Sequence, residues 1–506
     1  MAGLLAAAAA VAASEGLSAL LAGVTSPLLA VANRAVDTAP RPLKEWAIEH
    51  FGSADKPLLI TGVVGTVVVL AALAGAIGRR RPRVAVGAFA ALAVVAGAAA
   101  LTDRSATAGA LPRLLPALVL GGVAVGALVA LLRPLRADRA PHEPGRHASP
   151  ASFDRRAFLR AAAAVGAVAA TGGVVARGFA GTAAAAARAT LRIPRPDAPA
   201  PPVPPGASLD VPGITPYLTP NRSFYRVDTA LKVPDVPVDG WRLRVHGMVD
   251  RELELSFEDL LSRRLVERRI TLTCVSNPVG GHYLGNATWI GVPVHELLRE
   301  AGVRAGADAV KSTSADRWTA GTPLPVLMDR DRGALVAVAM NGEPLPLAHG
   351  FPARLVTPGL YGYVSATKWL VDLEVTRFRD FTAYWTTRGY AEQAPIKTSS
   401  RIDVPRPFAR VQAGPTTVAG VAWSQDRGIE SVEVRVDGGA WHRAGLAEQD
   451  NVDTWRQWSW EWDATPGNHL IEVRATDRSG YTQTADRAPI APDGSTGRHN
   501  VNVMVG

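Results

Sequence analysis

Five long apolar segments before residue 185 constrain the fold of this chain more than any other feature. They run approximately over Leu4–Val31, Leu58–Ile77, Val84–Leu101, Leu114–Leu132 and Phe158–Phe179. The second, third and fourth are close to the roughly 20 residues that a helix needs to cross a hydrocarbon core. The first contains Glu15, which indicates a tilted or protein-buried span with a functional acid, or else an interfacial position. The pattern predicts an N-terminal α-helical transmembrane bundle.

The distribution of arginines predicts how this bundle is oriented. One basic loop contains Arg79, Arg80, Arg81 and Arg83, and a second contains Arg133, Arg136, Arg139, Arg146, Arg155, Arg156 and Arg160. Loops rich in Lys and Arg remain in the cytoplasm. We therefore expect a multi-pass protein of the cytoplasmic membrane, with everything after the fifth segment on the extracytoplasmic side. The net charge of +9 follows from these loops and does not indicate nucleic-acid binding.

The fifth apolar segment begins differently from the others. Its start, Asp154-Arg-Arg-Ala-Phe-Leu159, resembles a twin-arginine export signal, in which paired arginines precede a weakly apolar stretch. Such export moves folded proteins, often because a cofactor is inserted in the cytoplasm. An ordinary basic anchor before a span is the alternative. The segment is either cleaved near Ala183–Ala187 or retained.

The rest of the chain divides by composition. Residues 193–212 hold eight prolines, which predicts a semi-rigid spacer. Beyond it the pattern is first mixed α/β and then all-β. We expect a bundle of four spans over 1–153, the signal-like fifth span over 154–186, a Pro/Ala-rich linker over 187–213, an α+β catalytic domain over 214–394 and an all-β domain over 395–506.

Local signals predict elements within the α+β domain. Helices are expected over Ser256–Arg264, with Ser256 as N-cap and Asp259 at its third position, and over Val294–Ala301, ending at Gly302. Strands are expected over Trp241–Val245, Glu252–Leu255, Ile270–Val275, Ala334–Met340 and Ala353–Thr357.

Cys274 is the only cysteine in the chain, which excludes an internal disulfide. It follows a strand-like run and opens onto a loop with two glycines, an arrangement that commonly presents a side chain to a ligand. A lone cysteine is also often a small buried hydrophobe. Its own surroundings leave both interpretations open.

Four separated motifs carry a resemblance to a known family. They are Thr271-Leu-Thr-Cys-Val-Ser-Asn277, Gly285-Asn-Ala-Thr-Trp-Ile-Gly-Val-Pro-Val-His-Glu-Leu-Leu298, the block Met340–Gly362, and Lys368-Trp-Leu370. In this order they resemble the molybdenum-binding core of the sulfite oxidase family. The similarity extends from about Thr215 to the C-terminus.

The resemblance implies one molybdenum-molybdopterin per chain, with Cys274 as the thiolate ligand of the metal beside two dithiolene sulfurs. A soft thiolate suits such a metal. Tyr390 is implied as an active-site tyrosine that assists coupled proton and electron transfer. Residues implied to hold the cofactor are Tyr225, Arg226, Ser312 (or Ser314), His349, Arg354, Thr367 and Lys368. Solvated charges, a loop histidine and a packing tyrosine are the alternatives.

The pattern over residues 395–506 predicts an immunoglobulin-like sandwich. Alternating runs at Ser431–Asp437, Trp458–Trp462 and His469–Ala475 are separated by turn residues. This part resembles the dimerisation domain of the same family, which implies a possible homodimer.

These features predict a membrane-anchored oxidoreductase that transfers an oxygen atom to or from a small sulfur compound. After Cys274 the chain continues Ser276-Asn-Pro-Val279, where sulfite oxidases carry arginines. An S- or N-oxide reductase of the methionine-sulfoxide type is therefore one alternative, and a non-catalytic membrane-tethered binding protein is another.

No haem is expected, because the sequence has no Cys-x-x-Cys-His motif and no histidine within the apolar segments. Electrons would pass to or from an external carrier, either a cytochrome c or a quinone-linked protein.

Overall fold

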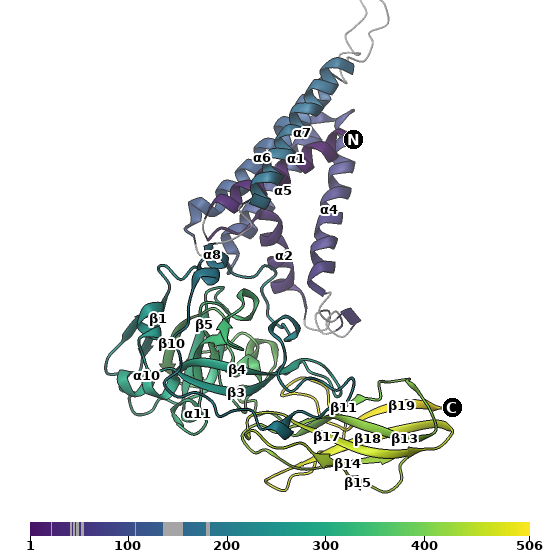
Figure 1. Cartoon of the computed structure of the whole chain (residues 1–506). Coiled ribbons are helices and arrows are strands. Elements are labelled where there is room, and N and C mark those ends of the chain that lie inside the picture. Colours follow the sequence, from purple (N-terminus) through teal and green to yellow (C-terminus); the bar gives the residue numbers. More distant parts are fainter. Residues whose placement is uncertain are drawn as a thin grey trace, which may run out of the picture. The chain divides into compact units, whose positions relative to one another are not determined.

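The computed structural model describes residues 1–21, 23–40, 55–106, 108–134, 155–178 and 183–506, together with residues 43, 46, 50 and 51. The chain forms two compact units. The first comprises Met1–Ala186 and Thr229–Asp235, and the second comprises Ala187–Asp228 and Val236–Gly506. Helices build the first unit and sheets dominate the second (Figure 1).

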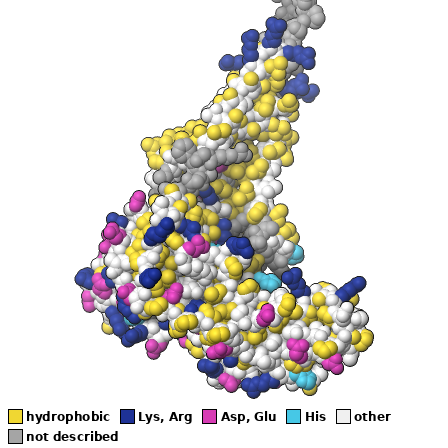
Figure 2. All heavy atoms as spheres, in the orientation of Figure 1, with side chains coloured by type: hydrophobic (Ala, Val, Ile, Leu, Met, Phe, Trp, Pro, Cys, Tyr) yellow, Lys and Arg dark blue, Asp and Glu magenta, His cyan; other side chains and the backbone are white. Residues whose placement is uncertain are grey.

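The first unit is helical, as predicted. Its helices are α1 (Ala2–Leu20), α2 (Pro27–Thr38), α4 (Asp55–Gly78), α5 (Pro82–Thr102), α6 (Ala110–Leu132) and α7 (Arg155–Gly178). Among the described residues, five of these helices, all except α2, are long and apolar enough to cross a membrane. Hydrophobic side chains cover the length of this unit, and Lys and Arg side chains gather at one end of it (Figure 2). Residues 135–154, which include Arg136, Arg139 and Arg146 of the second basic loop, lie outside the described residues.

The prediction of one span over Leu4–Val31 is wrong, because this segment forms α1 and the start of α2. Ser26 caps α2 and accepts a hydrogen bond from the Leu29 N–H at 3.4 Å, and Pro27 takes the first helical position. A serine cap followed by proline is a strong helix start, since proline lacks the N–H that would be unpaired there.

Small residues allow the helices of the first unit to pack closely. A Cβ atom on Gly75 of α4 would lie 2.6 Å from the Gly3 nitrogen of α1, and one on Gly16 would lie 2.9 Å from the Gly172 carbonyl of α7. Helices that meet in an apolar medium are held by such close backbone contact. The small residues of α1 therefore allow this helix to pack closely against its neighbours.

Two sheets and their helices form the first part of the second unit. One sheet has the order β3 (Val266–Thr273), β4 (Leu284–Pro293), β7 (Leu335–Met340) and β8 (Glu343–Pro344), with β9 (Arg354–Val356) paired to β7. The other has the order β2 (Leu253–Ser256), β1 (Arg242–Gly247), β10 (Leu370–Thr376), β5 (Ala309–Ser314) and β6 (Thr319–Pro323). The helices are α8 (Ala183–Thr190, which begins in the first unit), α9 (Phe257–Leu261), α10 (Val294–Ala301), α11 (Leu324–Met328) and α12 (Gly362–Ser365).

The two sheets share one hydrophobic core with α10. Leu243 of β1, Val336 of β7 and Leu297 of α10 are fully buried members of it. The predicted strands lie within a few residues of those observed, except that β3 begins four residues earlier than expected. The capping box of α9 is confirmed, with Ser256 and Asp259 bonded reciprocally. The end of α10 at Gly302 (φ 72°) is confirmed as well.

The Pro-rich stretch differs from the predicted spacer, because it lies against the second unit. Ala198 forms a parallel bridge with Val266, and its carbonyl accepts from the Glu267 N–H at 2.9 Å. Further along, the Leu209 N–H donates to the Gln457 side-chain oxygen at 2.6 Å. The stretch thus covers the open edge of β3, which would otherwise present unpaired backbone groups.

The last part of the chain is all-β, as predicted. One sheet has the order β11 (Ser399–Val404), β13 (Gly414–Trp423), β17 (Arg456–Ala464) and β16 (Gly445–Leu446). The other has the order β12 (Arg410–Val411), β19 (His499–Val505), β18 (Gly467–Asp477), β14 (Ile429–Val436) and β15 (His442–Arg443). Val418, Trp458 and Val473 are fully buried in a core common to both sheets.

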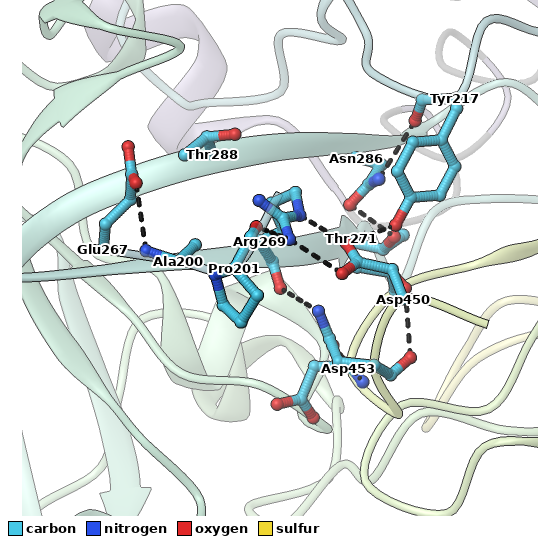
Figure 3. Close-up of polar contacts among 12 residues, drawn as sticks. Ala200, Pro201, Tyr217, Glu267, Arg269, Thr271, Asn286, Thr288, Asp450 and Asp453 are labelled. Carbon is cyan, nitrogen blue, oxygen red and sulfur yellow. Dashed lines mark hydrogen bonds and ion pairs between the residues drawn. The ribbon is translucent and has the colours of Figure 1, made fainter. Parts of the chain in front are cut away.

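A buried ion pair joins this all-β part to β3 (Figure 3). Arg269 of β3 forms a two-pronged contact with Asp450, and their side chains are only 6% and 4% exposed. Asp450 also accepts from the Tyr217 hydroxyl at 2.7 Å, and Arg269 donates to the Pro201 carbonyl at 2.6 Å. The pair therefore connects three segments that are far apart in the sequence.

We expect Asp450→Ala to destabilise the protein by about 3–5 kcal/mol, because it leaves Arg269 buried without its carboxylate. Chemical unfolding of the detergent-solubilised chain, followed by tryptophan fluorescence, measures this loss.

The matched control is Asp250→Ala, which breaks the exposed pair with Arg304 (3.0 Å, side chains 57% and 74% exposed). Its expected effect is within about 1 kcal/mol, since exposed pairs contribute little. Equal effects of the two substitutions would contradict a special role for the Arg269–Asp450 pair.

Candidate active site

Cys274 lies directly after β3, so the strand and its neighbours fix the position of the thiol. Its N–H donates to the Tyr283 carbonyl at 2.9 Å, and the Ser276 N–H donates to its sulfur at 3.4 Å. The side chain is 8% exposed. Burial raises the pKa of the thiol, while the bond from Ser276 and the charge of Lys368 act in the opposite direction. The structure thus holds a buried thiol close to donors and a cation.

Arg354 begins β9, and the residue is 5% exposed. It donates to the carbonyl oxygens of His349 at 3.0 Å and Ala366 at 3.2 Å, and it lies 5.1 Å from the centre of the Trp289 ring. Its Nε is buried without a hydrogen-bond partner. Burial lowers the pKa of Arg354 to about 10. A buried cation with a free donor is costly unless an anion lies nearby.

Lys368 supplies a second buried cation. Its ammonium group pairs with Asp228, which also accepts from Arg226 Nε at 2.9 Å. It donates in addition to the Ala348 carbonyl at 3.3 Å. Burial lowers the pKa of Lys368 to about 8, and Asp228 counteracts this change. One carboxylate therefore faces two cations here.

His349 is buried beside these charges. Its Nε2 lies 3.2 Å from the Asn221 carbonyl, and its ring meets Phe224 edge to face at 5.5 Å. Burial, with the positive charges of Arg354 and Lys368, lowers the pKa of His349 to about 4. The imidazole is thus neutral at physiological pH and acts as a hydrogen-bonding group.

Tyr225 joins the same group of residues. Its ring stacks on Phe224 with centroids 5.2 Å apart. Burial raises the pKa of its hydroxyl, Cys274 adds to the rise, and Arg354 opposes it. The hydroxyl therefore lies within electrostatic reach of both the thiol and the guanidinium.

Ser312 and Thr367 are both fully buried, and their hydroxyl oxygens are 2.6 Å apart. This contact places Ser312 beside the residue that precedes Lys368. Ser314, the alternative to Ser312, instead accepts from the Asp316 N–H at 3.4 Å. The structure thus joins Ser312 to Thr367, two of the residues predicted to hold the cofactor.

Tyr390 lies in an aromatic cluster. Its ring is edge to face with Tyr363 at 5.5 Å and with Trp385 at 5.3 Å, and the side chain is 7% exposed. Tyr390 belongs to the same buried hydrophobic cluster as Tyr361 and Val275, the residue that follows Cys274.

Three residues near the thiol were not singled out from the sequence. Asp228 is the counterion of Lys368, and Trp289 lies under Arg354. Burial raises the pKa of Tyr361 to about 12, and Asp493 and Cys274 add to this rise. Trp289 and Tyr361 stand inside quoted motifs, and Asp228 lies two residues after Arg226, which was the available signal.

The residues present fit an anionic metal cofactor. Cys274 offers one soft sulfur ligand, and Arg354 and Lys368 bring buried positive charge with one unpaired N–H. Among the residues that the structure describes, no three His, Cys, Asp or Glu side chains come together to hold a metal ion. Cys274 would thus hold the metal together with a cofactor that supplies further ligands.

Comparisons with known proteins agree with this interpretation. Residues 230–385 match the family described as "oxidoreductase molybdopterin binding domain". The chain is 31% identical over 321 residues to sulfite oxidase of Gallus gallus, covering 54% of this chain and 70% of that protein. It is 29% identical over 324 residues to mitochondrial sulfite oxidase of Homo sapiens, covering 54% of this chain and 58% of that protein.

Among solved structures, the crystal structure of the sulfane dehydrogenase SoxCD from Paracoccus pantotrophus is similar. It shares 25% sequence identity and a TM-score of 0.50, covering 57% of this chain and 81% of that chain. The chain thus spans just over half the length of the mammalian sulfite oxidases and most of the avian and SoxCD chains. The chain belongs to the sulfite oxidase family of molybdopterin-binding oxidoreductases.

Proposed function

We propose that the protein is a membrane-anchored molybdenum-molybdopterin oxidoreductase that transfers an oxygen atom to or from a small sulfur compound. The observation that carries this proposal is the buried Cys274 thiol beside an excess of buried positive charge. The names of the similar proteins, sulfite oxidase and sulfane dehydrogenase, support a sulfur compound as substrate. Membership of an oxidoreductase family argues against a non-catalytic binding protein.

Each site residue has a proposed task. Cys274 is the single protein ligand of the metal, and Tyr390 handles a proton during the redox steps. Residues proposed to hold the molybdopterin are Tyr225, Arg226, Ser312, His349, Arg354, Thr367 and Lys368. When bound, the molybdenum-molybdopterin group supplies two-electron oxygen-transfer chemistry.

The protein's own contribution follows from the contacts described above. The Ser276 N–H and the charge of Lys368 favour the thiolate form of Cys274. Arg354 Nε is free to donate to an anionic oxygen of the cofactor. Neutral His349 offers a hydrogen bond without adding a further charge.

An S- or N-oxide reductase of the methionine-sulfoxide type is the second candidate. The loop after Cys274 carries Ser276, Pro278 and Val279, all uncharged. Affinity for a free anion such as sulfite depends on local positive charge, and neutral oxides do not need it. A screen of the molybdenum-loaded protein with a redox dye, comparing sulfite with methionine sulfoxide, decides between the two.

The helical unit is proposed to anchor the enzyme in the cytoplasmic membrane. Helix α4 leaves Val64, Val69 and Leu73 exposed on its surface, which suits contact with lipid. In this proposal the catalytic and all-β domains lie outside, and the twin-arginine-like start of α7 takes part in export.

The all-β part is proposed to be an immunoglobulin-like sandwich that mediates homodimerisation. Its two sheets with a shared core support the sandwich architecture. Electrons are proposed to pass to or from an external carrier, either a cytochrome c or a quinone-linked protein.

We expect Cys274→Ser to reduce turnover by at least about 100-fold, since even outer-shell partners of a metal contribute about 10–100-fold. Circular dichroism and the unfolding temperature should remain close to those of the wild type. The wild-type protein, purified from cells that make the cofactor, should contain one molybdenum per chain. Only trace molybdenum, or full activity of the variant, would contradict the proposal.

We expect Lys368→Gln to weaken retention of molybdopterin by about 10–100-fold, because a charge-assisted hydrogen bond contributes about 1.5–3 kcal/mol. Molybdenum and pterin contents after gel filtration measure this effect. Lys311→Gln is the control, because Lys311 pairs with Glu374 at 2.8 Å on the partly exposed strand β5. Similar losses in both variants would remove Lys368 from the proposed cofactor site.

Alkaline phosphatase fused after Gly506 should be active, because the proposed topology places the C-terminus outside the cytoplasm. The same reporter inserted after Arg81, in a basic loop, should be inactive. Activity of the second fusion but not the first would reverse the proposed orientation.

A further inference from the structure

A cavity of about 360 Å³ opens beside the first half of β3. Its walls come from three segments: the Pro-rich stretch at residues 198–201, the molybdopterin-binding domain, and residues 450–451 of the all-β part. The contacts along one wall are drawn in Figure 3, where Ala200, Pro201, Glu267, Arg269 and Asp450 approach one another. Its volume is in the range of pockets that hold small organic ligands.

The cavity is distinct from the cysteine site. Arg269 borders it, and Cys274 follows five residues later along an extended strand. At about 3.3 Å per residue, this separates the two positions by about 16 Å. The cavity also uses none of the residues proposed to hold molybdopterin.

Four arginines and two acids line this cavity. Its lining includes Arg264, Arg268, Arg269 and Arg330, together with the acids Glu267 and Asp450. Both acids already have partners inside the protein: Asp450 binds Arg269, and Glu267 accepts from the Ala200 N–H at 3.1 Å. In the part of the chain that the structure describes, no hydrogen bond or ion pair engages Arg330. The other three arginines have acidic partners: Arg264 binds Glu296, Arg268 binds Asp453 and Arg269 binds Asp450. Among the described residues, Arg330 is therefore the arginine of the lining whose charge has no acidic partner.

His295 provides a second, independent observation. It borders the cavity, is only 7% exposed, and its Nδ1 is buried without a hydrogen-bond partner. Burial lowers the pKa of His295; Glu296 opposes this change, and the charges of the neighbouring arginines, Arg330 among them, add to it. A buried polar atom without a partner destabilises the folded protein. A ligand that reaches Nδ1 would remove this destabilisation.

Arg268 is held at the cavity by the absence of a side chain at Gly333. A Cβ atom there would lie 1.7 Å from Arg268 Nη1, so the guanidinium occupies the space that any other residue would fill. The other terminal nitrogen of Arg268, Nη2, lies 3.3 Å from a carboxylate oxygen of Asp453, which fixes the guanidinium. The fork of Arg268 is therefore pre-positioned at the cavity.

Most of the remaining lining is apolar, apart from Asn451. Ala198, Pro199, Pro201, Pro293 and Leu335 form it. We propose that this cavity binds a small organic anion, with a phosphate-type head group on Arg268, Arg330 and His295 and its organic part against the prolines. Planar guanidinium groups recognise tetrahedral oxyanions through paired N–H donors.

Titration calorimetry on the detergent-solubilised full chain, at constant ionic strength, tests the proposal. The probes are phenyl phosphate and inorganic phosphate. Both should bind, and phenyl phosphate should bind more tightly if the natural ligand is an organic ester rather than the free anion. Arg330→Gln should weaken phenyl phosphate binding by about tenfold, which corresponds to about 1.4 kcal/mol.

Two further variants separate binding from folding. Arg443→Gln is the control, because Arg443 is an exposed arginine of β15 that does not line the cavity. It should leave the affinity unchanged. His295→Phe should weaken phosphate binding without lowering the unfolding temperature, since it removes an unpaired buried nitrogen. Affinities that are the same in the wild type, Arg330→Gln and His295→Phe would overturn the proposal.

Discussion

Buried positive charge is the constraint on which the active site depends. Arg354 and Lys368 are withdrawn from water strongly enough to lower their pKa values to about 10 and about 8. Asp228 compensates Lys368, whereas Arg354 has only carbonyl oxygens and the Trp289 face. Cations are costly to bury alone and become favourable once an anionic group lies among them. Burial of these two cations thus destabilises the folded chain. The same two cations would bind an anionic cofactor.

Contacts along strand β3 help to fix the position of the Cys274 thiol. Its open edge is covered by Ala198, its middle is tied to the all-β part by Arg269 and Asp450, and Cys274 follows its last residue. A ligand residue is most accurately placed when rigid elements and their supporting contacts fix it. The all-β part therefore contributes to the position of Cys274.

Sequence signals correctly predicted those structural features that depend on neighbouring residues. The Ser256 cap, the Gly302 helix end and the order of the motifs around Cys274 are examples, because each depends on neighbouring residues. Ser26 and Pro27 form a helix-start signal that breaks the first apolar segment into two helices. The signal stands inside a long apolar run, which favours the prediction of one continuous span. The Arg269–Asp450 pair and the docking of the Pro-rich stretch depend on long-range packing, which no local pattern encodes.

The two groups of cations differ in a way that bears on what each can hold. Arg354 and Lys368 are nearly closed off, at 5% exposure for the residue and 11% for the side chain respectively. A ligand among them would be largely shielded from water, which suits a resident cofactor. The Arg268 side chain is 33% exposed, and Arg330 is exposed. Because these groups keep much of their hydration, they lose and regain a ligand at low cost, which suits an exchangeable small molecule.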